Sequence, residues 1–206
     1  MPASPQFLVF FTAALLLAVT PGPGIYYVLA RSLAGGRREG ILSAAGTFLG
    51  GLAHVVAAAF GLSAVLAASA LAFETVRYAG AAYLIYLGIA TIRQRNEGLE
   101  TNARRSNNAF AQGVVTEALN PKTALFFLSF IPQFVSLKAG HVALQFLALG
   151  AISVALNTSA DIVVACFAGT LGAHLVGSAR FRRRQRSVSG AMMIGLGVYV
   201  AAAEPK

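Results

Sequence analysis

The sequence predicts an all-α polytopic membrane protein in which six transmembrane helices form two inverted three-helix repeats, with helices 1 and 4 broken at proline motifs. The first observation is composition: the 206 residues are 57% hydrophobic and 11% charged, whereas soluble domains carry about 25% charged residues. The second is length, because the apolar residues fall into segments of about 20 residues, enough to cross a bilayer as a helix. The third is a proline motif in each half of the chain, at residues 20–24 and 120–124.

Six apolar segments are predicted to span the membrane, and together they make a single transmembrane domain. They lie at about 7–30, 41–67, 73–92, 112–135, 142–176 and 188–203. Repeat one covers about 7–92, a basic linker covers about 93–111, and repeat two covers about 112–203. The fifth segment is longer than one crossing needs. We expect one tilted helix rather than two short ones meeting near residues 157–161, because no loop-like stretch divides it.

Positive charge is concentrated in three of the loops between these spans. The formal net charge is +9, and twelve of the 16 basic residues lie in the first, third and fifth loops. The positive-inside rule places these loops in the cytoplasm and both termini in the periplasm. Since each repeat has three spans, the second repeat enters from the opposite face, which makes the repeats inverted. The loop residues are Arg31, Arg37, Arg38, Arg93, Arg95, Arg104, Arg105, Arg180, Arg182, Arg183, Arg184 and Arg186.

Each proline motif is predicted to break its helix and to expose backbone groups inside the membrane. Proline has no N–H, so Pro21 leaves the carbonyl of Leu17 unpaired and Pro121 leaves that of Glu117 unpaired. The half-helix after each break presents free N–H groups that suit a carboxylate, whereas the freed carbonyls suit an ammonium. We therefore expect a zwitterionic, amino-acid-like small molecule to bind here. The predicted substrate-binding residues are Thr20, Pro21, Gly22, Pro23, Gly24, Asn120, Pro121 and Lys122.

Three charged residues are predicted to lie inside the membrane. Lys122 is about ten residues, or ~15 Å, into its span, which puts it near the midplane. Such a charge costs roughly 2.5–3.5 kcal/mol in lipid, so it must face protein, water or a partner. Two interpretations stay open: a salt bridge from Lys122 that only locks helices together, or a polar midplane cavity. Glu117 and Asp161 are the proton-coupling candidates, with a purely structural hydrogen bond as the alternative for Asp161.

Two further polar residues are predicted to belong to the cavity. Asn157 is one helical turn before Asp161 and so shares its face. His54 lies on a stripe of small and polar residues in the second span, Thr47 among them, and a packing role is its alternative. No paired cysteines or acidic cluster suggest a metal, and no phosphate-binding loop suggests a nucleotide, so we predict no metal and no cofactor.

Two blocks of sequence around the prolines resemble a known family. They are Thr20-Pro21-Gly22-Pro23 and Asn120-Pro121-Lys122-Thr123-Ala124-Leu125-Phe126-Phe127, the second continued by Ile131-Pro132-Gln133-Phe134. In length and motifs the chain is similar to the LysE/RhtB family of small amino-acid exporters over nearly its whole extent. The resemblance implies a multi-pass protein of the bacterial inner membrane that exports amino acids or related small metabolites by proton antiport. Members differ in substrate, and nothing in this sequence selects one.

Two other classes of function stay open on the sequence alone. A passive membrane channel or a scaffold subunit would use the same spans without concentrating a substrate. An intramembrane enzyme would need a nucleophile paired with a base, and no such pair is recognisable, so we predict that the chain is not an enzyme. The predicted partners are an amino-acid-like substrate, protons, the lipid bilayer and, as an open question, a second copy in a homodimer. The positive charge lies between apolar segments, so we predict no nucleic-acid partner.

Overall fold

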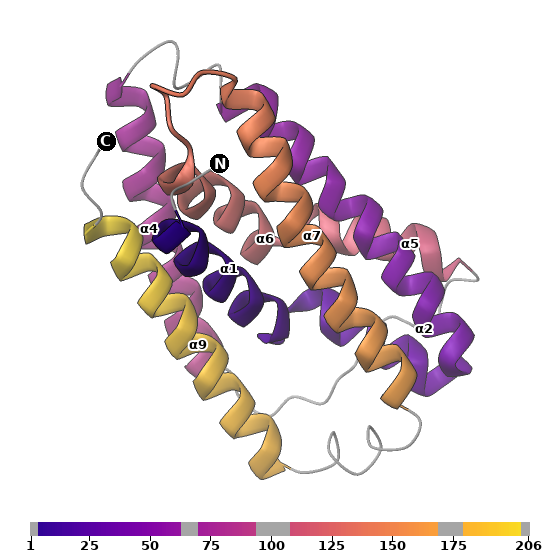
Figure 1. The fold of residues 1–206 in the computed structure, drawn as a ribbon. Coiled ribbons are helices and arrows are strands. Elements are labelled where there is room, and N and C mark those ends of the chain that lie inside the picture. The colour runs from indigo at the N-terminus through magenta and orange to yellow at the C-terminus, as the bar shows by residue number, and fades with distance from the viewer. Residues whose placement is uncertain (1–3, 63–69, 94–107, 169–178, 203–206) are drawn as a thin grey trace.

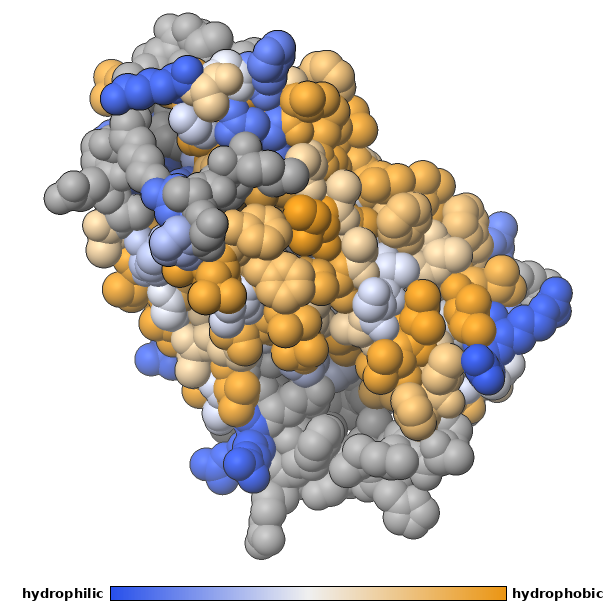
Figure 2. Space-filling model, in the orientation of Figure 1, coloured by the Kyte–Doolittle hydropathy of each residue, from blue (hydrophilic) through white to orange (hydrophobic). Residues whose placement is uncertain are grey.

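The structure, a computed structural model, describes residues 4–62, 70–93, 108–168 and 179–202. Within these ranges all regular structure is helical, as predicted (Figure 1). Figure 2 shows hydrophobic residues over the middle of one face, with hydrophilic residues mainly near its ends. Two helical stretches, Pro23–Gly61 and Val142–Phe167, are long and apolar enough to cross a membrane by themselves. A third span results if the bent pair Ala109–Ala118 and Pro121–Phe134 counts as one, so six spans remain a prediction.

The first helix breaks at the predicted proline motif. Helix α1 (Ser4–Val19) ends just before it, and α2 (Pro23–Ala57) begins with a proline at its first position, where the missing N–H costs nothing. Between them Gly22 has an extended backbone. Helix α2 continues into one π-helical turn, η1 (Ala58–Leu62).

The chain turns within residues 31–40, as predicted, but the ten-residue loop expected there is wrong, because α2 runs through it as two helical parts that meet at a kink. Its backbone is helical there except at Gly36, whose φ of 78° is in the region that glycine adopts most readily. The chain folds back at this point: Arg31 and Glu39 would be about 12 Å apart along a straight helix, yet Arg31 Nη2 is 2.9 Å from Glu39 Oε2. The reversal therefore takes one glycine rather than a ten-residue loop.

Helices α4 (Ala70–Arg93) and α9 (Ala179–Ala202) pack along each other (Figure 1). Glycines allow the close approach, since a Cβ built on Gly88 would lie 2.5 Å from the carbonyl oxygen of Gly190. Helix α4 has nearly the bounds of the predicted third span, 73–92, but it is not one of the helices that are long and apolar enough to cross a membrane, so this span stays a prediction. The predicted loop at residues 180–186 is wrong, because α9 already starts at Ala179. Arginine and glutamine favour helix, and no glycine or proline stops it there.

The fourth span is divided as predicted. Helix α5 (Ala109–Ala118) and helix α6 (Pro121–Leu125) meet at a bend of 42°. The chain continues through a π-helical turn, η3 (Phe126–Phe130), and a 3₁₀ turn, η4 (Ile131–Phe134), which contains the second proline of this span. Most of the predicted basic linker, residues 94–107, lies outside the described residues, and α5 begins two residues before the predicted end of that linker.

Helix α7 (Val142–Phe167) passes through residues 157–161 without a break, which confirms the prediction of a single helix as far as Phe167. Residues 169–176 of that predicted span lie outside the described residues. The hydrophobic core brings α1, α7 and the fourth span together. It is built around a run of buried phenylalanines: Phe10, Phe126, Phe127, Phe130, Phe134 and Phe146. This aromatic cluster holds the two broken helices against each other.

Candidate functional site

The side chain of Lys122 joins the two helix breaks. It lies at the start of α6, is 3% exposed, and donates from Nζ to the carbonyl oxygens of Thr20 at 2.9 Å and Leu17 at 3.2 Å. Leu17 is the residue whose carbonyl loses its helical partner at Pro21; it also accepts a hydrogen bond from the N–H of Thr20 at 3.1 Å. The ammonium of the second motif thus satisfies the backbone that the first motif exposes.

Glu117 is held in place by the residues of its own break. Its carboxylate is 1% exposed and accepts hydrogen bonds from Thr123 Oγ1 at 2.6 Å and from Asn120 Nδ2 at 2.9 Å. The other side-chain atom of Asn120, Oδ1, accepts from the backbone N–H of Lys122 at 3.0 Å and so caps α6. Gly24 lies against the same carboxylate, because a Cβ built on it would be 2.5 Å from Glu117 Oε2.

His54 satisfies the backbone at the second break. Its Nε2 is 2.9 Å from the carbonyl oxygen of Glu117, which loses its helical partner at Pro121 and also accepts from the backbone N–H of Asn120 at 3.0 Å. Because a carbonyl only accepts, this contact requires the proton on Nε2. The ring also stacks on Phe127 with 6.0 Å between centroids. These contacts fit a packing role for His54, the alternative to a cavity role that the sequence left open.

A small cavity lies between α1, α2, the fourth span and α7, beside the two breaks. It encloses about 20 Å³, which is room for about one water molecule. Its walls are both polar and apolar. The lining residues are Ala14, Leu17, Thr47, Gly51, Glu117, Thr123, Phe126, Phe127, Ser153, Val154, Asn157, Thr158 and Asp161. An amino acid does not fit in this volume, so the conformation described is a closed one.

The described residues that line the cavity include two acids and no basic residue. Asp161 is 2% exposed and accepts a hydrogen bond from Thr47 Oγ1 at 2.8 Å. Glu117 lines the same space, whereas Lys122 and His54 are not among the lining residues. The ion pairs between described residues join Arg31 to Glu39 and Arg77 to Glu74, so Lys122 contacts carbonyls rather than either acid. An acceptor-rich wall of this kind suits a cation such as an ammonium or a proton.

The predicted site residues are therefore brought together in part. The structure places Thr20, Asn120, Lys122 and Glu117 around the two breaks, and Asn157 and Asp161 on the α7 wall of the cavity. Sequence reasoning did not assign a role to four hydroxyl side chains that also line it: Thr47, Thr123, Ser153 and Thr158. Two of them had a visible signal, since Thr123 belongs to the second motif and Thr47 to the polar stripe of the second span.

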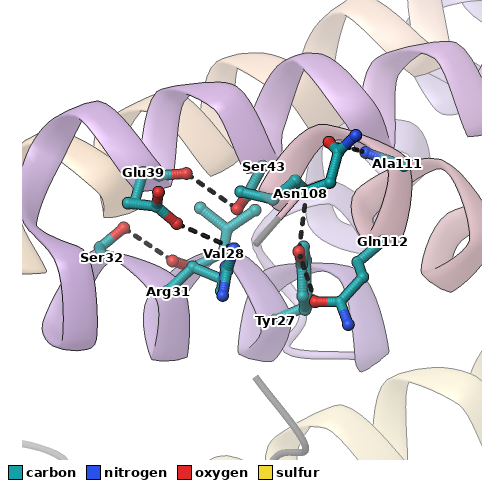
Figure 3. A network of polar contacts seen from close by, with 10 residues as sticks. Tyr27, Val28, Arg31, Ser32, Glu39, Ser43, Asn108, Ala111 and Gln112 are labelled. Atoms are coloured by element: carbon teal, nitrogen blue, oxygen red, sulfur yellow. Dashed lines mark hydrogen bonds and ion pairs between the residues drawn. The ribbon is translucent and has the colours of Figure 1, made fainter. Parts of the chain in front are cut away.

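A second set of polar contacts holds the half-helix that follows the first break, the part of α2 from Pro23 to the kink at Gly36 (Figure 3). Tyr27 donates from its hydroxyl to the carbonyl of Ala109 at 2.7 Å, which ties the half-helix to the start of α5. One turn further on, Arg31 pairs with Glu39 across the bend at Gly36. These contacts lie at the end of the molecule that the charge pattern assigns to the cytoplasm. They fix the first part of α2 against α5 and against the part of α2 that follows Gly36.

Many helical membrane transport proteins have helices that are broken inside the membrane, and the breaks meet around buried charged residues at the substrate site. The chain belongs to the LysE family of translocators: the family model described as "LysE type translocator" matches residues 15–204. It is therefore a membrane transport protein and not an enzyme.

Similar proteins come from several bacteria. An uncharacterized membrane protein of Pseudomonas aeruginosa is 32% identical, covering 96% of this chain and 95% of its own. An uncharacterized membrane protein of Vibrio cholerae is 29% identical over 96% of this chain and 97% of its own. A leucine efflux protein of Salmonella typhimurium is 27% identical over 93% of this chain and 92% of its own. No solved structure matches the chain.

Proposed function

We propose that the protein is a secondary exporter of amino acids or related small metabolites, driven by proton antiport in the bacterial inner membrane. The observation that carries this proposal is the bond from Lys122 of the second break to the exposed carbonyls of Leu17 and Thr20 at the first break. Family membership and the leucine efflux protein among the relatives support the substrate class.

Substrate binds, in this proposal, where the two breaks meet near the bilayer midplane. Glu117 and Asp161 take its ammonium, because they give the cavity wall its negative charge. Lys122 takes its carboxylate after leaving the two carbonyls that it contacts in the closed conformation. The chain would then have six spans in two inverted repeats, with the site on the axis between the repeats and both termini in the periplasm.

Proton coupling is assigned to the acids of the cavity. When no substrate is bound, a proton on Asp161 or Glu117 replaces the ammonium as the positive partner, so proton and substrate bind in alternation. Alternating occupancy of one site by two ions is what antiport requires, because each displaces the other before the protein changes conformation. Asp161 is the better candidate, since Glu117 already has two side-chain donors and Asp161 has the single bond from Thr47.

The experiment that tests the proposal is uptake of radiolabelled amino acids into inverted membrane vesicles, with and without an imposed acidic lumen. Accumulation of one amino acid that requires the gradient is expected, and it names the substrate class. The matched negative control is Lys122→Met, and Gly195→Ala serves as a neutral variant because a Cβ there meets nothing within 4 Å. Equilibration of the amino acid without accumulation would indicate a passive channel. Counterflow of labelled substrate separates an exporter, which shows it, from a channel, which does not.

A further inference from the structure

Arg77 in α4 is a buried cation that the proposed site does not use. Its side chain is almost fully buried, and Nη2 donates to the hydroxyl of Tyr78 at 2.8 Å. The carboxylate of Glu74 is 4.0 Å from Nη1, which is too far for a hydrogen bond. Nε and Nη1 have no hydrogen-bond partner in the described part of the chain. The guanidinium lies over the ring of Tyr78, 4.6 Å from its centroid, but this contact uses no N–H group. Buried N–H groups without an acceptor are costly, so they favour a further partner that accepts hydrogen bonds.

Ser129 offers a second unpaired polar group at the same interface. It lies in the π-helical turn η3, its side chain is fully buried, and its Oγ has no partner among the described residues. Gly80 follows Arg77 by one helical turn, on the same face of α4. A Cβ built on Gly80 would collide with the Ser129 hydroxyl, so this face of α4 and η3 are in direct contact. Short π-helical turns recur at functional sites.

This interface lies outward from the proposed central site. Ser129 is seven residues after Lys122, or about 10 Å along a helix, toward the end of the fourth span that the charge pattern assigns to the periplasm. Arg77 is likewise seven residues from the start of α4 at the same end. Glu74 and Tyr78, the contacts of Arg77, are partly exposed and lie toward the surface. By depth, this pair lies between the central site and the end of the fourth span that the charge pattern assigns to the periplasm.

We propose that Arg77 and Ser129 form an outer binding station for the carboxylate of the exported molecule. A guanidinium binds a carboxylate with parallel charge-assisted hydrogen bonds, and the serine hydroxyl donates one more. The station is closed in this conformation and opens when the short turns η3 and η4 shift away from α4. This inference rests on the proposed export function and adds to it a second place where the substrate is held before release.

Two half-substrates separate binding of the carboxylate from binding of the ammonium. Lys122→Met, measured beside the variants of the station, separates the station from the central site, where the export proposal gives the carboxylate to Lys122. N-acetyl-L-leucine has the carboxylate and no ammonium, whereas L-leucinamide has the ammonium and no carboxylate. Binding of each to the purified protein in detergent is measured for wild type, Arg77→Gln, Arg77→Lys and Ser129→Ala. N-acetyl-L-leucine is expected to bind wild type and to lose about tenfold to a hundredfold in affinity in Arg77→Gln, since hydrogen bonds to a charged group are lost. Ser129→Ala and Arg77→Lys are expected to lose less, and leucinamide binding is expected to be unchanged in all three.

The outcomes distinguish the station from the function on which it rests. Equal binding of N-acetyl-L-leucine to wild type and Arg77→Gln overturns the station and leaves the export proposal in place, with Lys122 as the partner of the carboxylate. If leucinamide binds wild type and N-acetyl-L-leucine does not, the station is overturned together with the assignment of the carboxylate to Lys122. If neither probe binds wild type, both proposals fail for this substrate class. If inorganic phosphate displaces N-acetyl-L-leucine as effectively as unlabelled N-acetyl-L-leucine does, Arg77 and Ser129 form a site for phosphate headgroups instead. That result overturns the carboxylate assignment. Should Arg77→Gln fail to fold, Ser129→Ala still decides, because it removes one buried oxygen and leaves the cation in place.

Discussion

The two helix breaks differ in the polar groups that they direct toward the centre of the molecule: backbone carbonyls at the first break, and side chains at the second. At residues 20–22 the polar groups that face inward are the carbonyls of Leu17 and Thr20, and the glycines leave room beside them. At residues 119–120 Asn120 caps the following helix and bonds Glu117, and Lys122 extends across to the first break. Two motifs that align at their prolines therefore have complementary roles, one as acceptor and the other as donor.

The difference shows that the two breaks, which the sequence predicts to be related as an inverted repeat, do not form a symmetric site. An acceptor surface and a donor surface that satisfy each other hold the closed conformation without substrate. In the proposed mechanism a zwitterion separates them, because it brings an anion for Lys122 and a cation for Glu117 and Asp161. Substitutions that damage one break and spare the other test this division of roles.

Lys122→Met is expected to have the largest effect. It removes the side chain of the second break that donates to the first, and it leaves the carbonyls of Leu17 and Thr20 without their charged partner. The expected loss of stability is roughly 3 kcal/mol, from hydrogen bonds made by a charged group, and transport should disappear. Efflux assays and thermal unfolding in detergent measure both. Lys138→Met is the matched control, since Lys138 is exposed; retained transport in Lys122→Met would refute the donor role.

Asp161→Asn is expected to abolish gradient-driven accumulation while substrate exchange continues. The amide keeps the shape and the hydrogen bond from Thr47 at 2.8 Å but cannot carry the exchanged proton. The measurement compares accumulation under an imposed proton gradient with exchange at equal pH on both sides. Asn157→Ala is the control, because it changes the same wall of the cavity without removing a charge. An unchanged pH dependence would make Asp161 a structural residue.

The two glycines of the first break should differ in how well they tolerate substitution by alanine, because different side chains of the second break lie against them. A Cβ on Gly24 would be 2.5 Å from Glu117 Oε2, whereas one on Gly22 would be 3.1 Å from the flexible Lys122 chain. We expect Gly24→Ala to cost about 1–3 kcal/mol by overpacking and to impair transport, with Gly22→Ala milder. Gly61→Ala is the control, since a Cβ there meets nothing within 4 Å. Equal effects of Gly22→Ala and Gly24→Ala would contradict this geometry.

The positions of both breaks could be predicted from sequence, because proline acts on the backbone next to it and needs no distant partner. The contacts between the breaks could not, since Lys122 and Leu17 are far apart in the chain and only packing decides where the ammonium points. The same limit explains the wrong loop at residues 31–40: charge and paired glycines marked a turn, but the length of the turn depends on how closely two helices pack. Helix α9 starts at Ala179 because the residues that follow favour helix. The prediction placed a loop there because it gave more weight to the cluster of positive charges than to helix propensity.

Asn120 should matter more to the second break than the proline beside it. Asn120→Ala removes the cap on α6, worth about 1 kcal/mol, together with one of the donors to Glu117. Reduced transport and a lower unfolding temperature are expected. Asn108→Ala is the matched control, because Asn108 caps α5 through a similar bond at 3.0 Å but lies away from the breaks. Equal losses in the two variants would mean that the cap, and not the contact with Glu117, is what counts.

Pro121→Ala is expected to have the smallest effect, about 0.4–1 kcal/mol from the added freedom of the unfolded chain. From sequence alone this change should let the span continue as a regular helix and weaken transport. In the structure the carbonyl that a restored N–H would seek, that of Glu117, already accepts from His54 and from the backbone of Asn120. The Asn120 cap also keeps the bend without help from the ring. Near-normal efflux in Pro121→Ala, set beside the loss in Asn120→Ala, would show that side chains maintain the second break; the reverse order would return that role to the proline.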